Sequence, residues 1–236
     1  MPRGRIRASE GIAEPHCVQN AAGGVERWQV GQRISPGLGV AMCAHCALLA
    51  SRMPTATTDT LVAMKRINVV GTSCSGKTTL ARAIAGRLTL PHVELDALFW
   101  ATDWTPVPHD VFRARVARAV ERERWVVDGG YSVVRDVTWE RVDTVVWLDY
   151  PLRTVLGRWA RRTVTRIQTR EEFWAGTGNR ESLRHALRPD GLLWWIVRTH
   201  RPRRTRLAAQ LALRPDIAVV RLDSPSASEA WLRSLS

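Results

Sequence analysis

The stretch Gly71-Thr72-Ser73-Cys74-Ser75-Gly76-Lys77-Thr78 has the pattern of a phosphate-binding P-loop. Its two glycines allow backbone angles that turn the N–H groups of the loop towards phosphate oxygens. In such loops the lysine, here Lys77, contacts the β- and γ-phosphates, and the hydroxyl of Thr78 binds Mg²⁺. The stretch, extended to Thr79, therefore predicts a site for ATP and Mg²⁺, with Lys77 as a catalytic residue.

The segments around this loop alternate between apolar runs and helical patterns. The run Ile67–Val70 suits a strand buried on both faces, and the Ala-rich stretch Leu80–Leu88 suits a helix after the loop. This strand–loop–helix context is the one that a P-loop requires. Further strands are predicted at His92–Leu95, Trp125–Val127, Thr144–Leu148 and Ile217–Leu222, and further helices at 108–122, 152–167 and 226–235. Strands separated by helices predict an α/β fold with a parallel sheet.

The chain is strongly basic, with 35 lysine and arginine residues against 22 acidic ones and a formal net charge of +13. Only Lys65 and Lys77 are lysines, so a chain that otherwise uses arginine has kept lysine where the P-loop needs a slim point charge. Between Arg153 and Arg206 there are 14 arginines and 4 acids, a net charge of +10. This segment lies between the fourth and fifth predicted strands, where a covering element could reach the nucleotide.

Three acids, Asp96, Asp128 and Asp149, follow predicted strands. Because ligands of open α/β sheets bind at the carboxyl ends of the strands, we expect at least one acid to serve Mg²⁺, directly or through water. A turn or a helix cap is the alternative role for any one of them. The strand that ends at Asp149 looks like the Mg²⁺-binding strand of P-loop motors, but Tyr150 stands where those motors carry a glutamate that activates water. A transferase is therefore favoured over a hydrolytic motor.

Several stretches besides the P-loop carry a family resemblance. They are Pro91-His92-Val93-Glu94-Leu95-Asp96, Trp125-Val126-Val127-Asp128-Gly129, Val146-Trp147-Leu148-Asp149-Tyr150-Pro151 and Gly178-Asn179-Arg180-Glu181-Ser182-Leu183. With them, the chain from Met64 to about residue 235 resembles the nucleoside-monophosphate-kinase group of P-loop kinases. Within that group it is most similar to the adenylate-kinase-related bacterial proteins called topology modulation proteins.

The resemblance implies a five-stranded parallel sheet in the order 2-3-1-4-5, with helices on both faces. It also implies an Arg-rich helical lid at about residues 158–206 and transfer of the γ-phosphoryl group of ATP. Asp128 would help to hold Mg²⁺ through water, and Arg158 and Arg162 would stabilise the phosphoryl group during transfer. Arg135 is the candidate for gripping the acceptor, although it lies further along the chain than its counterpart in the family.

The acceptor is left open by the sequence. Residues 97–125 contain tryptophans and lack the arginine pattern that binds AMP in adenylate kinases. We expect the acceptor to bind between the ends of strands two and three, where the Asp96 carboxylate orients its hydroxyl or takes its proton. Arg135 or Arg180 would offset the repulsion between that carboxylate and an anionic acceptor. An acceptor with both a hydroxyl and an anionic group is therefore favoured.

Residues 1–62 differ from the rest, because they are rich in Gly, Ala, Pro, Ser and Thr and show no sustained period. We expect a disordered extension, or a true start at Met64, ahead of a kinase-like domain over 63–236. The spacing Cys43-Ala-His-Cys46 suits a metal site, but no second pair follows, so incidental cysteines are favoured. The sequence contains no apolar run of about 18 residues, so it predicts no membrane-spanning helix. We expect a cytoplasmic protein that is a monomer or a weak dimer.

Three functions remain open on these grounds. The favoured one is an ATP-dependent kinase that acts on a small molecule or a nucleotide. The second is a nucleic-acid-associated P-loop NTPase, in which the Arg-rich segment grips the phosphates of DNA or RNA. The third is a regulatory protein that binds a nucleotide without turnover. A kinase places Arg158 and Arg162 over the P-loop, whereas a nucleic-acid surface spreads them along an outer stripe.

Overall fold

The computed structural model describes residues 64–169, 172–174, 176–179, 182, 186–189 and 191–235. The extension predicted over residues 1–62, the Cys43–Cys46 pair and the acceptor candidate Arg180 lie outside the described residues. The expectations about them stay predictions.

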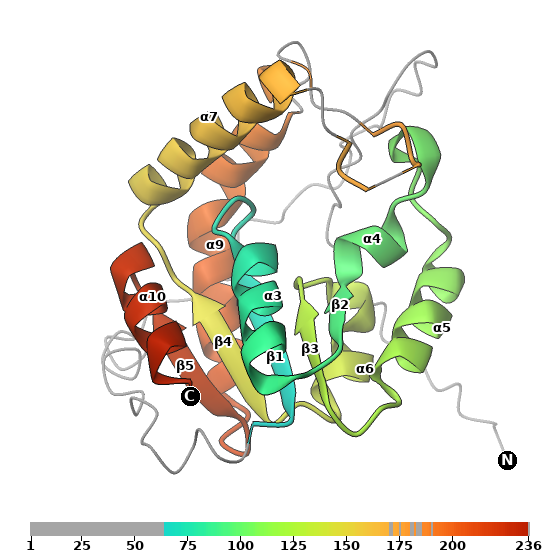
Figure 1. Cartoon of the computed structure of the whole chain (residues 1–236), viewed down its shortest axis with the longest axis vertical. Helices are drawn as coiled ribbons and strands as arrows, with labels where there is room; N and C mark the ends of the chain where they lie inside the picture. Colours follow the sequence, from blue (N-terminus) through green and yellow to red (C-terminus); the bar gives the residue numbers. More distant parts are fainter. Residues whose placement is uncertain are drawn as a thin grey trace, which may run out of the picture.

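A parallel sheet of five strands forms the centre of the described domain (Figure 1). Its order is β2-β3-β1-β4-β5, and every neighbouring pair is parallel. The strands are β1 (Arg66–Gly71), β2 (His92–Glu94), β3 (Trp125–Asp128), β4 (Thr144–Leu148) and β5 (Ala218–Leu222). This arrangement confirms the fold class and the strand order predicted above.

Helices follow the strands along the chain. They are α3 (Lys77–Leu88), α4 (Leu95–Phe99), α5 (His109–Val120), α6 (Arg135–Trp139), α7 (Leu152–Thr169), α9 (Leu192–Ala212) and α10 (Pro225–Ser234), with single 3₁₀ turns η1 (Thr102–Trp104) and η2 (Ser132–Val134). Helices α3, α5, α7 and α10 therefore match the predicted ranges, whereas α4, α6 and both 3₁₀ turns were not predicted. The sequence predicted no separate range for α9, which begins within the expected helical lid at about residues 158–206.

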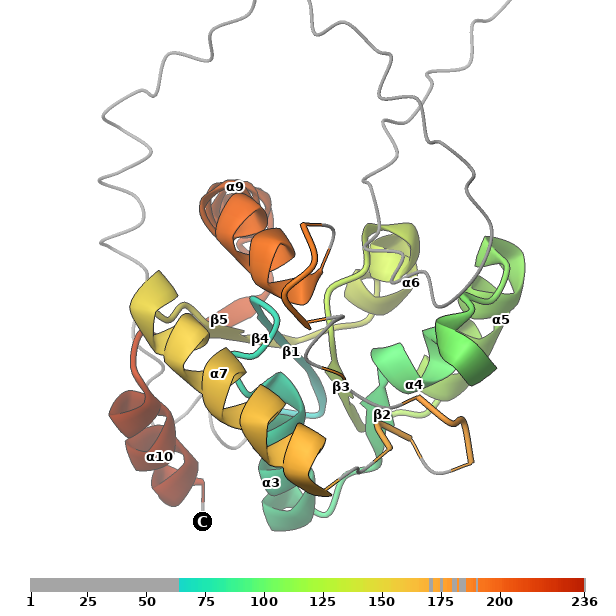
Figure 2. The same cartoon turned by 90° about the horizontal axis from the view of Figure 1, so that it is seen from above.

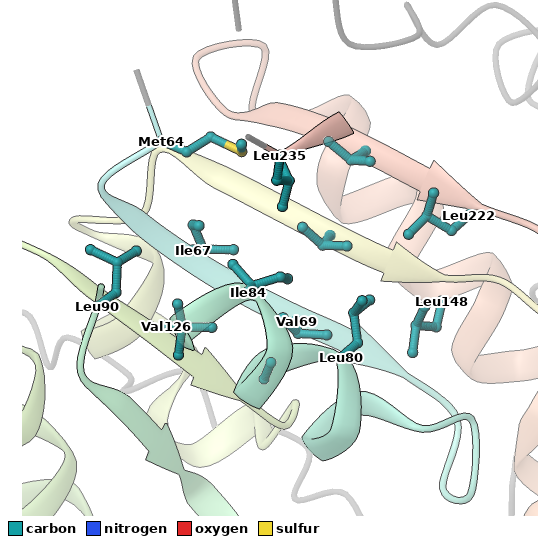
Figure 3. Packing of buried hydrophobic residues seen from close by; sticks show 14 of the residues in the cluster. Met64, Ile67, Val69, Leu80, Ile84, Leu90, Val126, Leu148, Leu222 and Leu235 are labelled. Carbon is teal, nitrogen blue, oxygen red and sulfur yellow. The ribbon is translucent and has the colours of Figure 1, made fainter. Parts of the chain in front are cut away.

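The face of the sheet that carries α3 holds one half of the core (Figure 3). Ile67 and Val69 of β1 pack there with Leu80 and Ile84 of α3, and Leu235 closes the same cluster from the end of the chain. Burying one such side chain contributes about 1.5–3 kcal/mol. This packing anchors the strand before the P-loop and the helix after it, and so fixes both ends of the loop.

The other face of the sheet is covered by α5, α6 and the C-terminal half of α9. Phe112 of α5, Trp139 of α6 and Leu211 of α9 share a buried cluster with Val70 and Val127. Figure 2 shows α6 and α9 on the side of the sheet opposite to α3. Because successive residues of a strand point to opposite faces, β1 presents Val69 to α3 and Val70 to this second cluster.

The chain between β4 and β5 contains α7 and α9. α7 passes above the N-terminal end of α3, at the edge of the sheet where the P-loop lies (Figures 1 and 2). α9 then returns along the sheet, so the Arg-rich segment is split between a helix above the loop and a helix against the sheet. Residues 172–174 and 176–179, between these helices, contact the loop that joins α4 to α5.

One predicted boundary is wrong. The second strand ends at Glu94, and Asp96 stands in the first turn of α4 instead of at the strand end. The neighbouring strand β3 itself ends at Asp128, opposite Glu94, so the chain has no pairing partner beyond that point. Leu95 turns into the core instead, where it packs against Gly129.

Candidate active site

The two glycines of the P-loop stand where a side chain does not fit. A Cβ atom on Gly71 would lie 2.8 Å from the carbonyl oxygen of Leu148, the last residue of β4. Gly76 has a φ angle of 96°, in the region that favours glycine. A Cβ atom there would lie 2.5 Å from Nη1 of Arg158. The motif therefore matches both the turn of the loop and the close approach of a guanidinium group from α7.

The ammonium group of Lys77 lies against its own loop at the start of α3. It donates to the carbonyl oxygen of Thr72 at 3.1 Å, and the N–H group of Ser75 donates to the same oxygen at 3.1 Å. Burial lowers the pKa of Lys77, and the nearby carboxylates of Asp96 and Asp128 oppose that shift. An anionic phosphate in the loop would favour the charged lysine in the same way.

Asp128 lies deep in the site, next to the P-loop strand. It ends β3 opposite Val69 of β1, is 1% exposed, and contacts Nε2 of His92 at 2.8 Å. Its carboxylate and the half-buried hydroxyl of Thr78 are oxygen ligands of the kind that Mg²⁺ prefers. Within the described part of the chain, no three His, Cys, Asp or Glu side chains are grouped to hold a metal ion. The residues present thus fit a Mg²⁺ ion that takes its other ligands from phosphates and water.

Asp149 is committed to two arginines and not to the P-loop. Oδ1 accepts from Nε of Arg204 at 2.6 Å, and Oδ2 contacts Nε and Nη2 of Arg221 at 2.8 Å and 2.6 Å. Asp149 is 5% exposed. Its two ion pairs therefore link α9 to β5 beneath the surface. Of the acids considered for Mg²⁺, this one has a structural role.

Asp96 faces Tyr131, in the turn after β3. Its Oδ1 accepts from the Tyr131 hydroxyl at 2.5 Å. Burial, together with the charge of Asp96, raises the pKa of Tyr131 far above its usual value, so the phenol stays protonated and keeps donating. Tyr131 also packs on Phe99, with ring centroids 4.9 Å apart, and this contact fixes the orientation of the phenol.

Two arginines of α7 approach the P-loop and the segment beyond it. Arg158 donates from Nη1 to the carbonyl oxygen of Ser75 at 2.9 Å, and its guanidinium lies 5.2 Å from the Tyr150 ring. Arg162 stands one turn further along, 5.7 Å from the Phe173 ring. Its Nε and Nη2 atoms are buried and have no hydrogen-bond partner among the described residues. Such donors are costly to leave unsatisfied, which indicates that an anion belongs beside them.

A pocket opens beside the P-loop, on the face of the sheet that carries α9. It begins at Thr72 and passes the turn after β3 to the arginines of α6 and α9. Its lining includes Asn68, Thr72, Leu95, Gly129, Gly130, Tyr131, Arg135, Trp139, Arg203, Arg206 and Leu207. The predicted residue Arg135 is therefore in the pocket wall, and its guanidinium lies 5.7 Å from the Trp139 ring.

Sequence reasoning missed Arg203 and Asn68. Arg203 donates from Nη2 to the carbonyl oxygen of Gly130 at 3.2 Å, and lies close enough to Lys77 to lower the pKa of that lysine. A helical period over α9 would have placed Arg203 on the same face as the partly buried Leu207, which is a usable signal.

Asn68 is the polar residue inside an otherwise apolar strand. Its Nδ2 donates to the carbonyl oxygens of Val127 and Gly129, both at 3.2 Å, and its Oδ1 accepts from Nε1 of Trp139 at 3.0 Å. The side chain therefore holds the turn after β3 at the floor of the pocket. An asparagine within an apolar strand was the available signal, because a buried amide needs partners.

The structure brings Lys77, Asp96 and Asp128 close enough for their charges to interact, and Arg158 of α7 contacts the P-loop at Ser75. The P-loop residues Ser73, Cys74 and Thr79 lie in the loop and in the first turn of α3. None of the described helices is long and apolar enough to cross a membrane.

Fold and loop together define a P-loop α/β protein, and comparison with known proteins adds the following. No protein-family model matches the chain, and neither does any curated protein. Among solved structures, it is similar to shikimate kinase from Bacteroides thetaiotaomicron at 16% identity and a TM-score of 0.46, covering 73% of this chain and 97% of that one. It is also similar to shikimate kinase from Acinetobacter baumannii in complex with shikimate, at 16% identity and a TM-score of 0.44, covering 76% and 94%.

A gluconokinase from Sinorhizobium meliloti 1021 is similar at 22% identity and a TM-score of 0.33, covering 64% of this chain and 97% of that one. These likenesses are too distant to carry an argument about activity. The closer resemblance to topology modulation proteins stays a prediction, and the function must be argued from the site.

Proposed function

We propose that the chain is an ATP-dependent phosphotransferase that moves the γ-phosphoryl group of ATP to a hydroxyl of a small molecule that also carries an anionic group. The observation that carries this proposal is the position of Arg158, whose guanidinium group donates to the Ser75 carbonyl oxygen of the P-loop. A surface built for nucleic acid has no need of that contact. A phosphotransferase needs positive charge at this place, because negative charge spreads over the phosphoryl oxygens during transfer.

The nucleotide side uses residues of the P-loop and residues that contact it. Lys77 would exchange its bond to the Thr72 carbonyl oxygen for bonds to phosphate oxygens. Thr78 and Asp128 would hold Mg²⁺, which neutralises charge on the phosphates when it is bound. Arg162 lies one turn beyond Arg158 on α7, and its buried, unsatisfied donors suit the charge that develops in the transition state.

The transfer step is a direct displacement at phosphorus. The acceptor oxygen forms a bond to the γ-phosphorus, the bond from that phosphorus to the oxygen bridging to the β-phosphate breaks, and ADP leaves with the bridging oxygen. The hydroxyl proton passes to the carboxylate of Asp96, which is oriented by its hydrogen bond from Tyr131. Asp96 therefore acts as the base or, before transfer, as the group that orients the hydroxyl.

The pocket supplies the preference for an anionic acceptor. Arg135 and Arg203 stand in its wall, and Thr72 links it to the P-loop. Guanidinium groups bind carboxylates and phosphates with paired hydrogen bonds, so they suit an acceptor that carries one of these groups. The same charges offset the repulsion between such an acceptor and Asp96.

A nucleic-acid-associated NTPase is the second candidate, favoured by a different set of arginines. Arg153 and Arg161 of α7 and Arg198 and Arg201 of α9 are exposed to solvent. Exposed arginines on neighbouring helices are typical of phosphate-backbone contacts. A solvated surface accounts for them equally well, whereas the contact of Arg158 with the P-loop supports the phosphotransferase.

Turnover of ATP by the full-length chain tests the proposal. ADP formation would be measured with Mg²⁺ alone, and then with added hydroxy acids, sugars, sugar phosphates, nucleoside monophosphates, single-stranded DNA and RNA. We expect stimulation by a small hydroxylated anion, with the phosphorylated product recovered in an amount equal to the ADP. Stimulation by DNA or RNA alone would favour the NTPase, and binding of ATP without turnover under any condition would favour a regulatory protein.

A further inference from the structure

The segment between α7 and α9, here called the connecting segment (residues 172–174 and 176–179), is fastened to the loop after α4 by one side chain. Asn179 is 1% exposed. Its Oδ1 accepts from the N–H group of Trp104 at 2.8 Å, and its Nδ2 donates to the carbonyl oxygen of Ala101 at 3.0 Å. Both ends of the amide are used at once, the carbonyl oxygen as an acceptor and the NH₂ group as a donor.

Aromatic contacts accompany this pair of hydrogen bonds. The Trp104 ring packs edge-on against Phe173 at 4.7 Å and against Trp174 at 5.8 Å. Trp174 donates from Nε1 to Oε1 of Glu94, the last residue of β2, at 3.1 Å. The connecting segment therefore touches the acceptor side of the site at two places, one at the end of β2 and one after α4.

The loop that Asn179 binds has an uncommon backbone. Asp103 and Trp104 have φ angles of 54° and 55°, in the left-handed region that residues other than glycine rarely adopt. Such a conformation persists only when its surroundings hold it in place. Asn179 does this directly, because it binds the N–H group of Trp104 and the carbonyl oxygen of Ala101 within the same turn.

The connecting segment also supports the arginines of α7. The N–H group of Phe173 donates to the carbonyl oxygen of Asn179 at 2.9 Å, which ties the backbone of the two residues together. The Phe173 ring lies 3.7 Å from the guanidinium of Arg166 and 5.7 Å from that of Arg162. A cation is attracted to an aromatic face at such distances. The position of Asn179 therefore sets the position of the ring on which Arg162 rests.

We propose that Asn179 is a positioning residue for phosphoryl transfer: it locks the connecting segment onto the Ala101–Trp104 loop and thereby holds Phe173 and Arg162 towards the P-loop. This inference rests on the proposed function, because Arg162 acts there on the transferring group. The inference adds that Arg162 stays in place only while the loop after α4 keeps the left-handed turn at Asp103 and Trp104. The buried amide of Asn179 then couples the two sides of the site, together with the contacts of Phe173 and Trp174.

The test compares two ligands that do not require a known acceptor. Mg·ADP probes the P-loop alone, whereas Mg·ADP with aluminium fluoride places an anion where the phosphoryl group transfers and so recruits the arginines of α7. Dissociation constants for both would be measured on full-length wild type, Asn179→Ala, Asn179→Asp and Arg162→Ala. We expect each variant to weaken the aluminium fluoride complex by about tenfold or more, the loss of one charge-assisted contact, with Mg·ADP binding within about twofold of wild type.

Gln168→Ala is the matched control, since it removes an exposed amide from α7 and should change neither constant. Asn179→Asp keeps the acceptor for Trp104 and guards against a folding defect in the alanine variant. An unchanged aluminium fluoride complex in both Asn179 variants, or equal weakening of the two complexes, would overturn the positioning role. A wild-type chain that binds no Mg·ADP would instead remove the proposed function, and this inference with it.

Discussion

The P-loop, the central part of the nucleotide side, is one continuous stretch from Gly71 to Thr79, whereas the acceptor side is assembled from distant parts of the chain. Asp96 comes from α4, Tyr131 from the turn after β3, and Arg203 from α9. The first side needs only a strand and a helix to fix its ends. The acceptor side exists only once the sheet has formed and α9 has packed on it.

The two sides differ in how their charges are satisfied as well. Lys77 is bonded to its own loop, and Arg158 to the same loop, so the nucleotide side is organised before any ligand binds. Lys77 would exchange its bond to Thr72 for phosphate oxygens on binding, and donors that are held in place in this way need little reorganisation during transfer. On the acceptor side, Arg135 and Arg203 stand in the wall of a pocket. The comparison therefore predicts that mutations on the nucleotide side abolish turnover, while those on the acceptor side alter which molecules are used.

Lys77→Ala should give the largest effect, because it removes the charged clamp from the phosphates. We expect turnover to fall by about 10³-fold or more, while the thermal unfolding midpoint stays close to that of wild type. ADP release and circular dichroism would measure the two quantities. Lys65→Ala is the control, since it removes the other lysine, which is exposed. Near-wild-type turnover in Lys77→Ala would break the assignment of the nucleotide side.

Asp96→Asn tests the point where the two sides meet. Removing a base or orienting group should lower kcat by about 10²-fold, the usual contribution of such a group. Binding of Mg·ADP should change little, because the phosphates are held by the loop. Calorimetry would follow the nucleotide, and product formation the transfer. Asp110→Asn, on the exposed side of α5, is the matched control.

If Asp96→Asn instead weakened nucleotide binding and left kcat unchanged at saturating ATP, Asp96 would be the Mg²⁺ residue in place of Asp128. That outcome would move the acceptor away from α4 and leave Tyr131 without a role in catalysis.

The contrast between a continuous loop and an assembled acceptor side also explains which features could be predicted from the sequence. The P-loop and the order of elements are local patterns, and so they were predictable. The role of Asp149 was not, because its partners Arg204 and Arg221 lie 55 and 72 positions away in a chain that has arginines almost everywhere. Arg203 was missed for the same reason. In so Arg-rich a sequence, composition does not separate an arginine of the site from one on the surface. The packing of α9 on the sheet is what brings Arg203 to Gly130.

Arg203→Ala should sharpen the distinction between the sides. Its guanidinium lines the pocket, so its loss should raise the KM for an anionic acceptor by about tenfold, in the range of one charged hydrogen bond, with a smaller change in kcat. The KM for ATP should stay within about twofold of wild type by the same reasoning. Arg201→Ala, an exposed neighbour on α9, serves as the control. A raised KM for ATP with an unchanged KM for the acceptor would place Arg203 on the nucleotide side.

Glu94→Gln should give the smallest effect, and its sign depends on pH. Burial raises the pKa of Glu94, and the charge of Asp128 adds to that shift. A carboxyl group whose pKa is raised on folding contributes stability that is fully present below its unfolded pKa and is lost as the pH rises through its folded pKa. Glutamine keeps an oxygen that can accept from Nε1 of Trp174 but carries no charge.

The variant should therefore gain stability relative to wild type as the pH rises from about 4 to 8, the interval that begins near the unfolded pKa of a glutamate. Loss of the ion pair with Arg82 should matter little, because that arginine is 65% exposed. Urea unfolding at several pH values would measure the difference, with the exposed Glu121→Gln as the reference. A relative stability that falls with rising pH would mean that the ionised carboxylate is stabilising. Glu94 would then anchor the connecting segment through its charge and not only through the hydrogen bond from Trp174.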